Sequence, residues 1–141
     1  MFAKNETGLD RFLEAQAPVF EAVCDELRSG QKRSHWMWYV FPQMRELGSS
    51  PQSQFYGINS RSEARAYLAH VVLGARLRQC VEMVLAVEDK SAGDIFDAPD
   101  DLKFQSSMTL FDAVSPREVF ELALNQYYLG RRHEATLKLL S

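Results

Sequence analysis

The chain has little of several features that define specialised classes of protein. Its 141 residues include two cysteines, Cys24 and Cys80, too few for the disulfide framework of a small secreted domain. No apolar run approaches the ~20 residues that span a bilayer, and the N-terminus lacks the apolar region of a signal peptide. We therefore expect a cytoplasmic protein with no membrane partner and with two reduced, buried thiols.

Positive charge and metal-binding spacings are also scarce. The sum of 16 Lys and Arg against 19 Asp and Glu gives a net charge of −3, which argues against a nucleic-acid partner because such binding depends on cations at phosphates. No local spacing joins the cysteines to His or carboxylate ligands, and no nucleotide-binding glycine loop or metalloprotease motif occurs. We predict no metal site and no cofactor.

What the chain does have is apolar residues at helical spacing. Its 46% hydrophobic and 25% charged residues are typical of a soluble globular protein, and its length suits one domain, residues 1–141, with a flexible segment at 1–8. Apolar residues recur every three or four positions from Leu9 to Leu27, interrupted at Pro18, and Gly30 is a stop signal. The pattern predicts an all-α fold, a compact single domain of several short helices.

Local signals place the boundaries of these helices. Residues 48–59 read as an irregular loop, and Ser60-Arg61-Ser62-Glu63 has the spacing of a capping box. The segment from Ser115 to Glu118 combines an N-cap serine, a proline at the first helical position and a glutamate at the third, so we expect a helix to begin there.

The most unusual segment is the aromatic run at residues 32–43. It contains both tryptophans, Trp36 and Trp38, together with Lys32, His35 and Gln43. A run this aromatic should be largely buried, yet the polar atoms of His35 and Gln43 are costly to bury unpaired. The mixture indicates either a hydrogen-bonded part of the core or the floor of a binding site.

A second unusual segment, residues 103–111, carries a lysine and three hydroxyls in an apolar helix. Lys103, Ser106 and Ser107 share one face at helical spacing and could bind a phosphate or carboxylate. Alternatively, the hydroxyls of Ser106, Ser107 and Thr109 bond to carbonyls one turn earlier and have no function. The acidic residues between 94 and 101 are explained by the dipoles of helix N-termini.

The chain resembles a family described only as domain of unknown function 1810. The likeness covers Leu9 to Leu140, and its hallmarks are the run from His35 to Gln43, Tyr56-Gly57-Ile58, residues 73–77 and 100–103, and the run from Ser106 to Phe111. The resemblance implies a compact helical domain, bacterial among its sources, with a shared polar and aromatic site. The label calpastatin that some members carry finds no support, because calpastatin segments are disordered and this composition is that of a folded core.

Two positions depart from the pattern of the family. Similar proteins often have His-Pro where this chain has His70-Val71, and often have an aspartate where this chain has His133. A catalytic role for a carboxylate at position 133 is therefore not available to this protein.

The hypothesis that we favour is a small anionic ligand, nucleotide-like in its chemistry, at a site formed by residues 32–43 and 103–111. In it Trp36 or Trp38 stacks on a planar group, while Lys103, Ser106 and Arg61 hold the anion. His35 is the acid–base candidate, Ser107 or Thr109 orients it, and Lys32, Gln43 and Tyr56 complete the site.

Two alternatives remain open. In the first, the two segments are core and the protein is a non-catalytic interaction module that binds a partner through Tyr127, Tyr128 or residues 44–47. A nucleic-acid role is the more remote alternative, supported only by scattered arginines and lysines.

Overall fold

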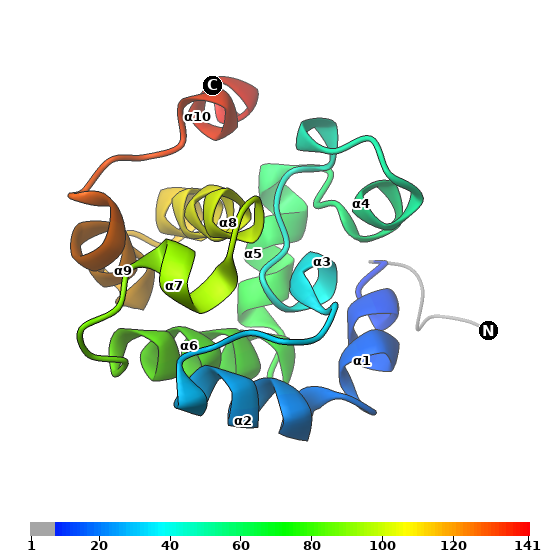
Figure 1. Ribbon diagram of the computed structural model, residues 1–141. Coiled ribbons are helices and arrows are strands. Elements are labelled where there is room, and N and C mark those ends of the chain that lie inside the picture. The colour runs from blue at the N-terminus through cyan, green and yellow to red at the C-terminus, as the bar shows by residue number, and fades with distance from the viewer. Residues whose placement is uncertain (1–7) are drawn as a thin grey trace.

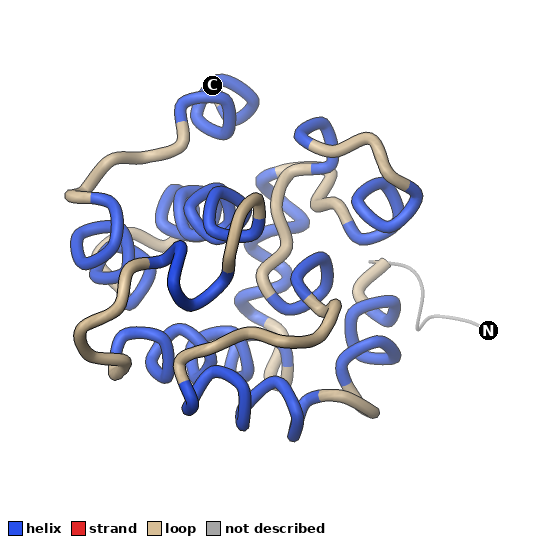
Figure 2. Tube along the Cα trace, viewed as in Figure 1, coloured by secondary structure: helices blue, strands red, loops and turns tan. Residues whose placement is uncertain are grey.

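The computed structural model describes residues 8–141, which form ten α-helices and one 3-10 turn (Figure 1). The elements are α1 (Asp10–Gln16), α2 (Phe20–Ser29), α3 (Met37–Val40), η2 (Arg45–Leu47), α4 (Pro51–Tyr56), α5 (Arg61–Ala69), α6 (Leu73–Leu85), α7 (Ala92–Phe96), α8 (Asp100–Val114), α9 (Val119–Tyr128) and α10 (Glu134–Leu140). Figure 2 shows helices and loops without a strand over this part of the chain, where Met44 and Ile58 form an isolated bridge. The predicted all-α class is confirmed.

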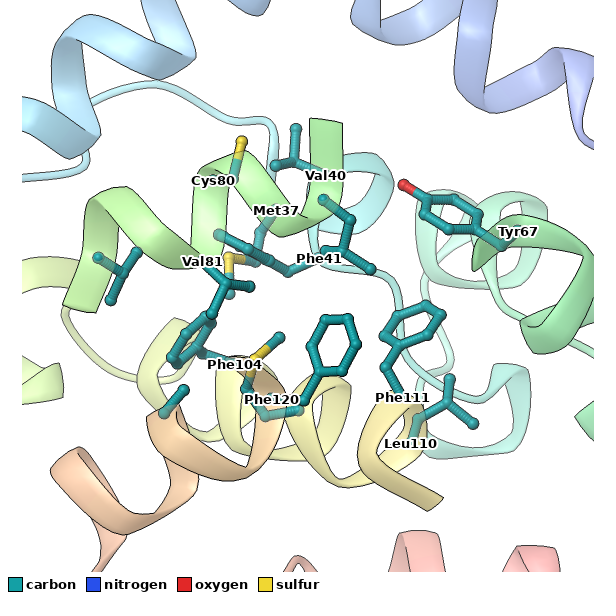
Figure 3. Packing of buried hydrophobic residues seen from close by; sticks show 14 of the residues in the cluster. Met37, Val40, Phe41, Tyr67, Cys80, Val81, Phe104, Leu110, Phe111 and Phe120 are labelled. Carbon is teal, nitrogen blue, oxygen red and sulfur yellow. The ribbon is translucent and has the colours of Figure 1, made fainter. Parts of the chain in front are cut away.

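Helix α8 occupies the middle of the molecule and packs against α5, α7, α9 and α10 (Figure 1). Every residue from Ser106 to Asp112 is buried, so this part of the helix is covered on all sides. Figure 3 shows its Phe104 and Phe111 facing aromatic and aliphatic side chains of neighbouring elements, among them Phe41 and Phe120. The core therefore surrounds α8.

Several local predictions agree with the structure. Helix α1 ends before Pro18 and α2 begins after it, and Gly30 closes α2 with a left-handed φ of 74°. The hydroxyl of Ser60 accepts a hydrogen bond from the Glu63 N–H, which is half of the predicted capping box; the Glu63 carboxylate accepts from the Asn59 N–H instead of the Ser60 N–H. Cys24 and Cys80 are buried free thiols.

Two local predictions are wrong. Residues 48–59 contain α4, whose N-cap Ser50 accepts a hydrogen bond from Ser53 N–H and is followed by a proline. The segment from Ser115 to Glu118 does not begin a helix, because α9 starts at Val119. The Glu118 carboxylate is instead paired with Arg78 at 2.7 Å, and it also accepts a hydrogen bond from the Ser115 hydroxyl. A tertiary ion pair has thus taken the groups expected to cap the helix.

The expected flexible segment at residues 1–8 lies outside the described residues except for Gly8. The Gly8 carbonyl accepts a hydrogen bond from the Arg11 guanidinium. Within residues 8–141, none of the helices combines the length and apolar character needed to cross a bilayer.

Candidate functional site

A cleft of about 310 Å³ separates the loop before α3 from the connection between α7 and α8. The Lys32 N–H donates to the Ile95 carbonyl at 2.8 Å, which holds the two segments side by side. We call this cavity the Trp38 cleft, and its lining residues are Lys32, Arg33, His35, Met37, Trp38, Phe96, Asp97, Ala98, Pro99 and Asp100. Its volume lies at the lower end of the range of small-molecule sites, about 300–1,000 Å³.

The carboxylate of Glu26, in α2, fixes the loop that forms one wall of the cleft. It accepts hydrogen bonds from the backbone N–H groups of Arg33 and Ser34 at 2.7 and 3.0 Å, and from the Trp36 indole at 2.9 Å. The Ser34 hydroxyl donates to it as well. Burial alone would raise the pKa of Glu26, but these hydrogen bonds outweigh burial and lower the pKa to about 2.

A second carboxylate, that of Asp100, bridges two lysines beside the cleft. Its oxygens lie 2.9 Å from Lys32 Nζ and 3.5 Å from Lys103 Nζ. Lys32 also donates to the Ser34 carbonyl at 2.6 Å, its ammonium lies 5.1 Å from the centroid of Trp36, and its side chain is only 8% exposed. Lys103 is 25% exposed and its ammonium lies 5.2 Å from the centroid of Trp38. Lys103 is therefore the lysine with donors left for a ligand.

His35 and Arg33 are exposed where they line the cleft. Within residues 8–141 neither side chain has a hydrogen-bond or ion-pair partner. The half-buried indole of Trp38 lies beside them. A guanidinium and an imidazole that are free to bind therefore lie next to a planar aromatic surface.

Trp38 also borders a much smaller pocket, which we call the Gln43 pocket. Its volume of about 10 Å³ holds roughly one water molecule. Lys103, Gln43 and Tyr56 line it together with Met37, Trp38, Phe41, Ser53 and Gly57. The two cavities adjoin, because Met37 and Trp38 line both of them.

The structure brings together only some of the residues predicted for the site. Lys32, His35 and Trp38 line the cleft, and Gln43, Tyr56 and Lys103 line the adjoining pocket. The other predicted ligand residues lie elsewhere, and they are Trp36, Arg61, Ser106, Ser107 and Thr109.

These five residues lie outside both cavities, and each has a place in the core or a partner within the fold. Trp36 is 1% exposed and donates its indole N–H to the Glu26 carboxylate. The hydroxyls of Ser106 and Thr109 donate to the carbonyls of Leu102 and Gln105, one turn earlier. Ser107 is fully buried, and Arg61 reaches the carbonyls of Ala113 and Leu140, away from both cavities. In the 103–111 segment, then, the three hydroxyls belong to the core.

Three cleft residues had no ligand role in the sequence interpretation. Arg33 read as a solvated entry to the aromatic run, and Asp97 and Asp100 read as helix N-terminal charges. The signal available in the sequence was Pro99, which lies between these two acidic positions and favours a turn there. The part of the chain described by the structure offers no group of three His, Cys, Asp or Glu side chains that could hold a metal ion.

The two histidines outside the cleft have structural partners. His70 Nδ1 accepts from the Val72 and Leu73 N–H groups at the start of α6. His133 is the N-cap of α10, where its Nδ1 accepts from the Thr136 N–H at 3.3 Å. An aspartate at position 133 could accept the same hydrogen bond, so the departure from the family pattern preserves a cap.

The fold and the cleft define a small all-helical protein with a mixed cationic and aromatic pocket. The chain belongs to the family described as protein of unknown function DUF1810, whose model matches residues 6–140. It is similar to the conserved hypothetical protein Rv1873 from Mycobacterium tuberculosis, with 51% identity and a TM-score of 0.92 over 94% of this chain and 95% of that one. A search of curated proteins found no match.

Proposed function

We propose that this protein binds a small anionic molecule with a planar, nucleotide-like group in the Trp38 cleft. The observation that carries the proposal is the free guanidinium of Arg33 and the exposed imidazole of His35 beside the half-buried Trp38. A guanidinium suits phosphate and carboxylate groups because its donors form a planar fork, and an indole face offers a stacking surface.

The charges around the cleft support an anion over a cation. Asp100 neutralises one of the two lysines it contacts, and Asp97 offsets one further charge. The four charged residues that line the cleft, Lys32, Arg33, Asp97 and Asp100, cancel one another when His35 is neutral. Lys103 of the adjoining Gln43 pocket adds the positive charge that favours an anion. Any reaction would use His35, which lines the cavity and is free to exchange a proton with a bound molecule.

A thermal-shift screen with AMP, GMP, CMP, UMP and phosphorylated sugars tests the proposal. A ligand at 100 times its Kd should stabilise the wild type by about 2.7 kcal/mol, several degrees for a domain of this size. Arg33→Gln and His35→Gln should fold normally, because both side chains are exposed, and should show a smaller shift. Loss of a charge-assisted hydrogen bond weakens binding by about tenfold or more.

Arg65→Gln is the matched control. It removes the same charge from an exposed arginine on α5, outside the Trp38 cleft, and should keep the full shift. Equal shifts in all four proteins would place the ligand elsewhere.

No shift with any probe would contradict the proposal and favour the interaction module. Of the residues first considered for a partner, Tyr127 and Tyr128 are half-buried and donate their hydroxyls to the carbonyls of Val84 and Asp101, and Met44 is buried. Leu122 and Leu129, 55% and 81% exposed, would then be the first residues to change.

A further inference from the structure

We infer that Asp97 is a ligand-binding residue of the Trp38 cleft and selects ligands that carry a vicinal diol, as a ribonucleotide does. The inference rests on the function proposed above and deepens it by naming the ligand class. Three observations support it: the backbone conformation of Asp97, its carboxylate without a partner, and the chemistry of the groups around it.

Asp97 has a backbone conformation that normally belongs to glycine. Its φ of 61° and ψ of 164° fall in a region that side chains with a Cβ rarely adopt. Two hydrogen bonds hold the residue there, from Asp97 N–H to the Gly93 carbonyl at 3.0 Å and from Asp101 N–H to the Asp97 carbonyl at 2.9 Å. Glycine would keep both backbone hydrogen bonds without the strain, so the side chain itself needs an explanation.

No structural role accounts for that side chain. Among residues 8–141 the exposed Asp97 carboxylate has neither a hydrogen-bond partner nor an ion-pair partner. It does not cap α8, which has no side-chain cap at its N-cap position, and the Leu102 N–H donates to Asp101 instead. The lysines nearby are paired with Asp100. What remains is its position in the lining of the Trp38 cleft.

The chemistry of a carboxylate restricts what it can bind. An ionised carboxylate only accepts hydrogen bonds, so the ligand must present donors at this end of the cleft. An ammonium group would meet repulsion from Arg33, which lines the same cleft, whereas hydroxyls carry no charge. Two adjacent hydroxyls can donate to the two carboxylate oxygens at once. A molecule with an anion for Arg33, a planar group for Trp38 and a diol for Asp97 is a ribonucleotide.

The test compares ribonucleotides with analogues that lack the diol. The tightest binder among AMP, GMP, CMP and UMP is titrated against its 2′,3′-dideoxy form by calorimetry. The wild type should prefer the ribonucleotide by about tenfold or more, since hydrogen bonds to a charged group are among the stronger ones. Asp97→Asn and Asp97→Gly should bind the two forms with Kd values within about twofold of each other.

Stability without ligand provides a second, independent readout. Asp97→Gly should raise Tm, because it relieves the strained backbone and leaves no partner unpaired. Asp89→Gly is the matched control: Asp89 is also exposed, also has a φ of 61°, and lies outside the Trp38 cleft. It should keep the preference for the ribonucleotide.

The outcomes separate this inference from the proposed function. Equal binding of ribonucleotide and dideoxynucleotide by the wild type would contradict diol recognition by Asp97 and would leave the proposed anion site unaffected. A lower Tm in Asp97→Gly would give the carboxylate a structural role and overturn the inference as well. Absence of binding by every nucleotide would overturn both.

Discussion

At the scale of single residues, Glu26 has the largest influence on the candidate site. Its carboxylate receives the backbone N–H groups of two successive loop residues and the side chains of Ser34 and Trp36. The loop that carries Arg33 and His35 therefore depends on one buried charge. The local sequence does not predict this role, because Glu26 has the pattern of an ordinary helical glutamate.

Glu26→Gln should destabilise the protein by about 1.5–3 kcal/mol near pH 7. The amide replaces a charged acceptor with a neutral one, and its NH₂ group faces the N–H and O–H donors of the loop, with which it cannot form hydrogen bonds as an acceptor. Urea denaturation measures the change. Glu21→Gln is the control, since Glu21 lies exposed on the same helix and should change stability by less than about 0.5 kcal/mol.

The same residue should give stability an acid dependence. Because the folded state lowers the pKa of Glu26 from 4.5 to about 2, its contribution is complete above pH ~4.5 and is lost as the pH falls towards 2. Denaturation curves between pH 5 and 2 should therefore converge for the wild type and Glu26→Gln. Parallel curves across that range would contradict the role given to this carboxylate.

The two tryptophans show that a sequence pattern alone does not predict which of two nearby side chains is buried. They are two positions apart, yet Trp36 is buried against Glu26 and Trp38 borders two cavities. Helix α3 has only four residues, too few for a periodic pattern to tell an inner face from an outer one. Sequence could place a polar and aromatic site in this run but could not choose between the two indoles.

At the scale of helices, Gly74 sets the distance between α5 and α6. A Cβ at position 74 would lie 2.1 Å from the Leu68 carbonyl oxygen, a backbone atom that cannot move aside without shifting a helix end. Gly74→Ala should therefore destabilise the protein by about 1–3 kcal/mol, despite the better helix propensity of alanine.

Gly93→Ala provides the contrast. A Cβ at position 93 would meet nothing closer than 3.6 Å, and the position is helical, so this change should be neutral or stabilising by up to about 1 kcal/mol. Thermal denaturation of both variants measures the difference. Equal effects of the two substitutions would contradict the close approach of α5 and α6.

Periodicity predicted several of the longer helices, whereas it missed the short helix α4, and local capping signals misplaced the start of α9. The apolar spacing of residues 9–27 and 104–111 predicted α1, α2 and the central part of α8. The predicted start of α9 was wrong because Arg78, 40 residues earlier, holds Glu118 in an ion pair. The helix α4 was missed because Ser50-Pro51, its cap and first residue, was assigned to a loop rich in glycine and serine.

At the scale of the whole molecule, burial decides the role of the three hydroxyls in α8: they belong to the core and not to a ligand-binding face. The spacing of Ser106 and Ser107 with Lys103 was consistent with a ligand face, but α8 passes through the centre of the fold and its serines are covered. Of these residues, Lys103 alone, in the first turns of the helix, reaches a cavity, the Gln43 pocket. Whether a polar helix face is a site or a core depends on where the helix lies, and that is a property of the complete fold.

The central claim, a ligand site at Trp38, is tested most directly by the two indole N–H signals in a ¹H–¹⁵N NMR spectrum. Trp38→Phe assigns them, because it removes one signal and keeps that of Trp36, whose N–H is bound to Glu26. Titration with AMP, GMP, CMP or UMP should shift the Trp38 signal progressively and leave the Trp36 signal nearly in place. A Trp38 signal that stays fixed at saturating concentrations of all four nucleotides would contradict the account.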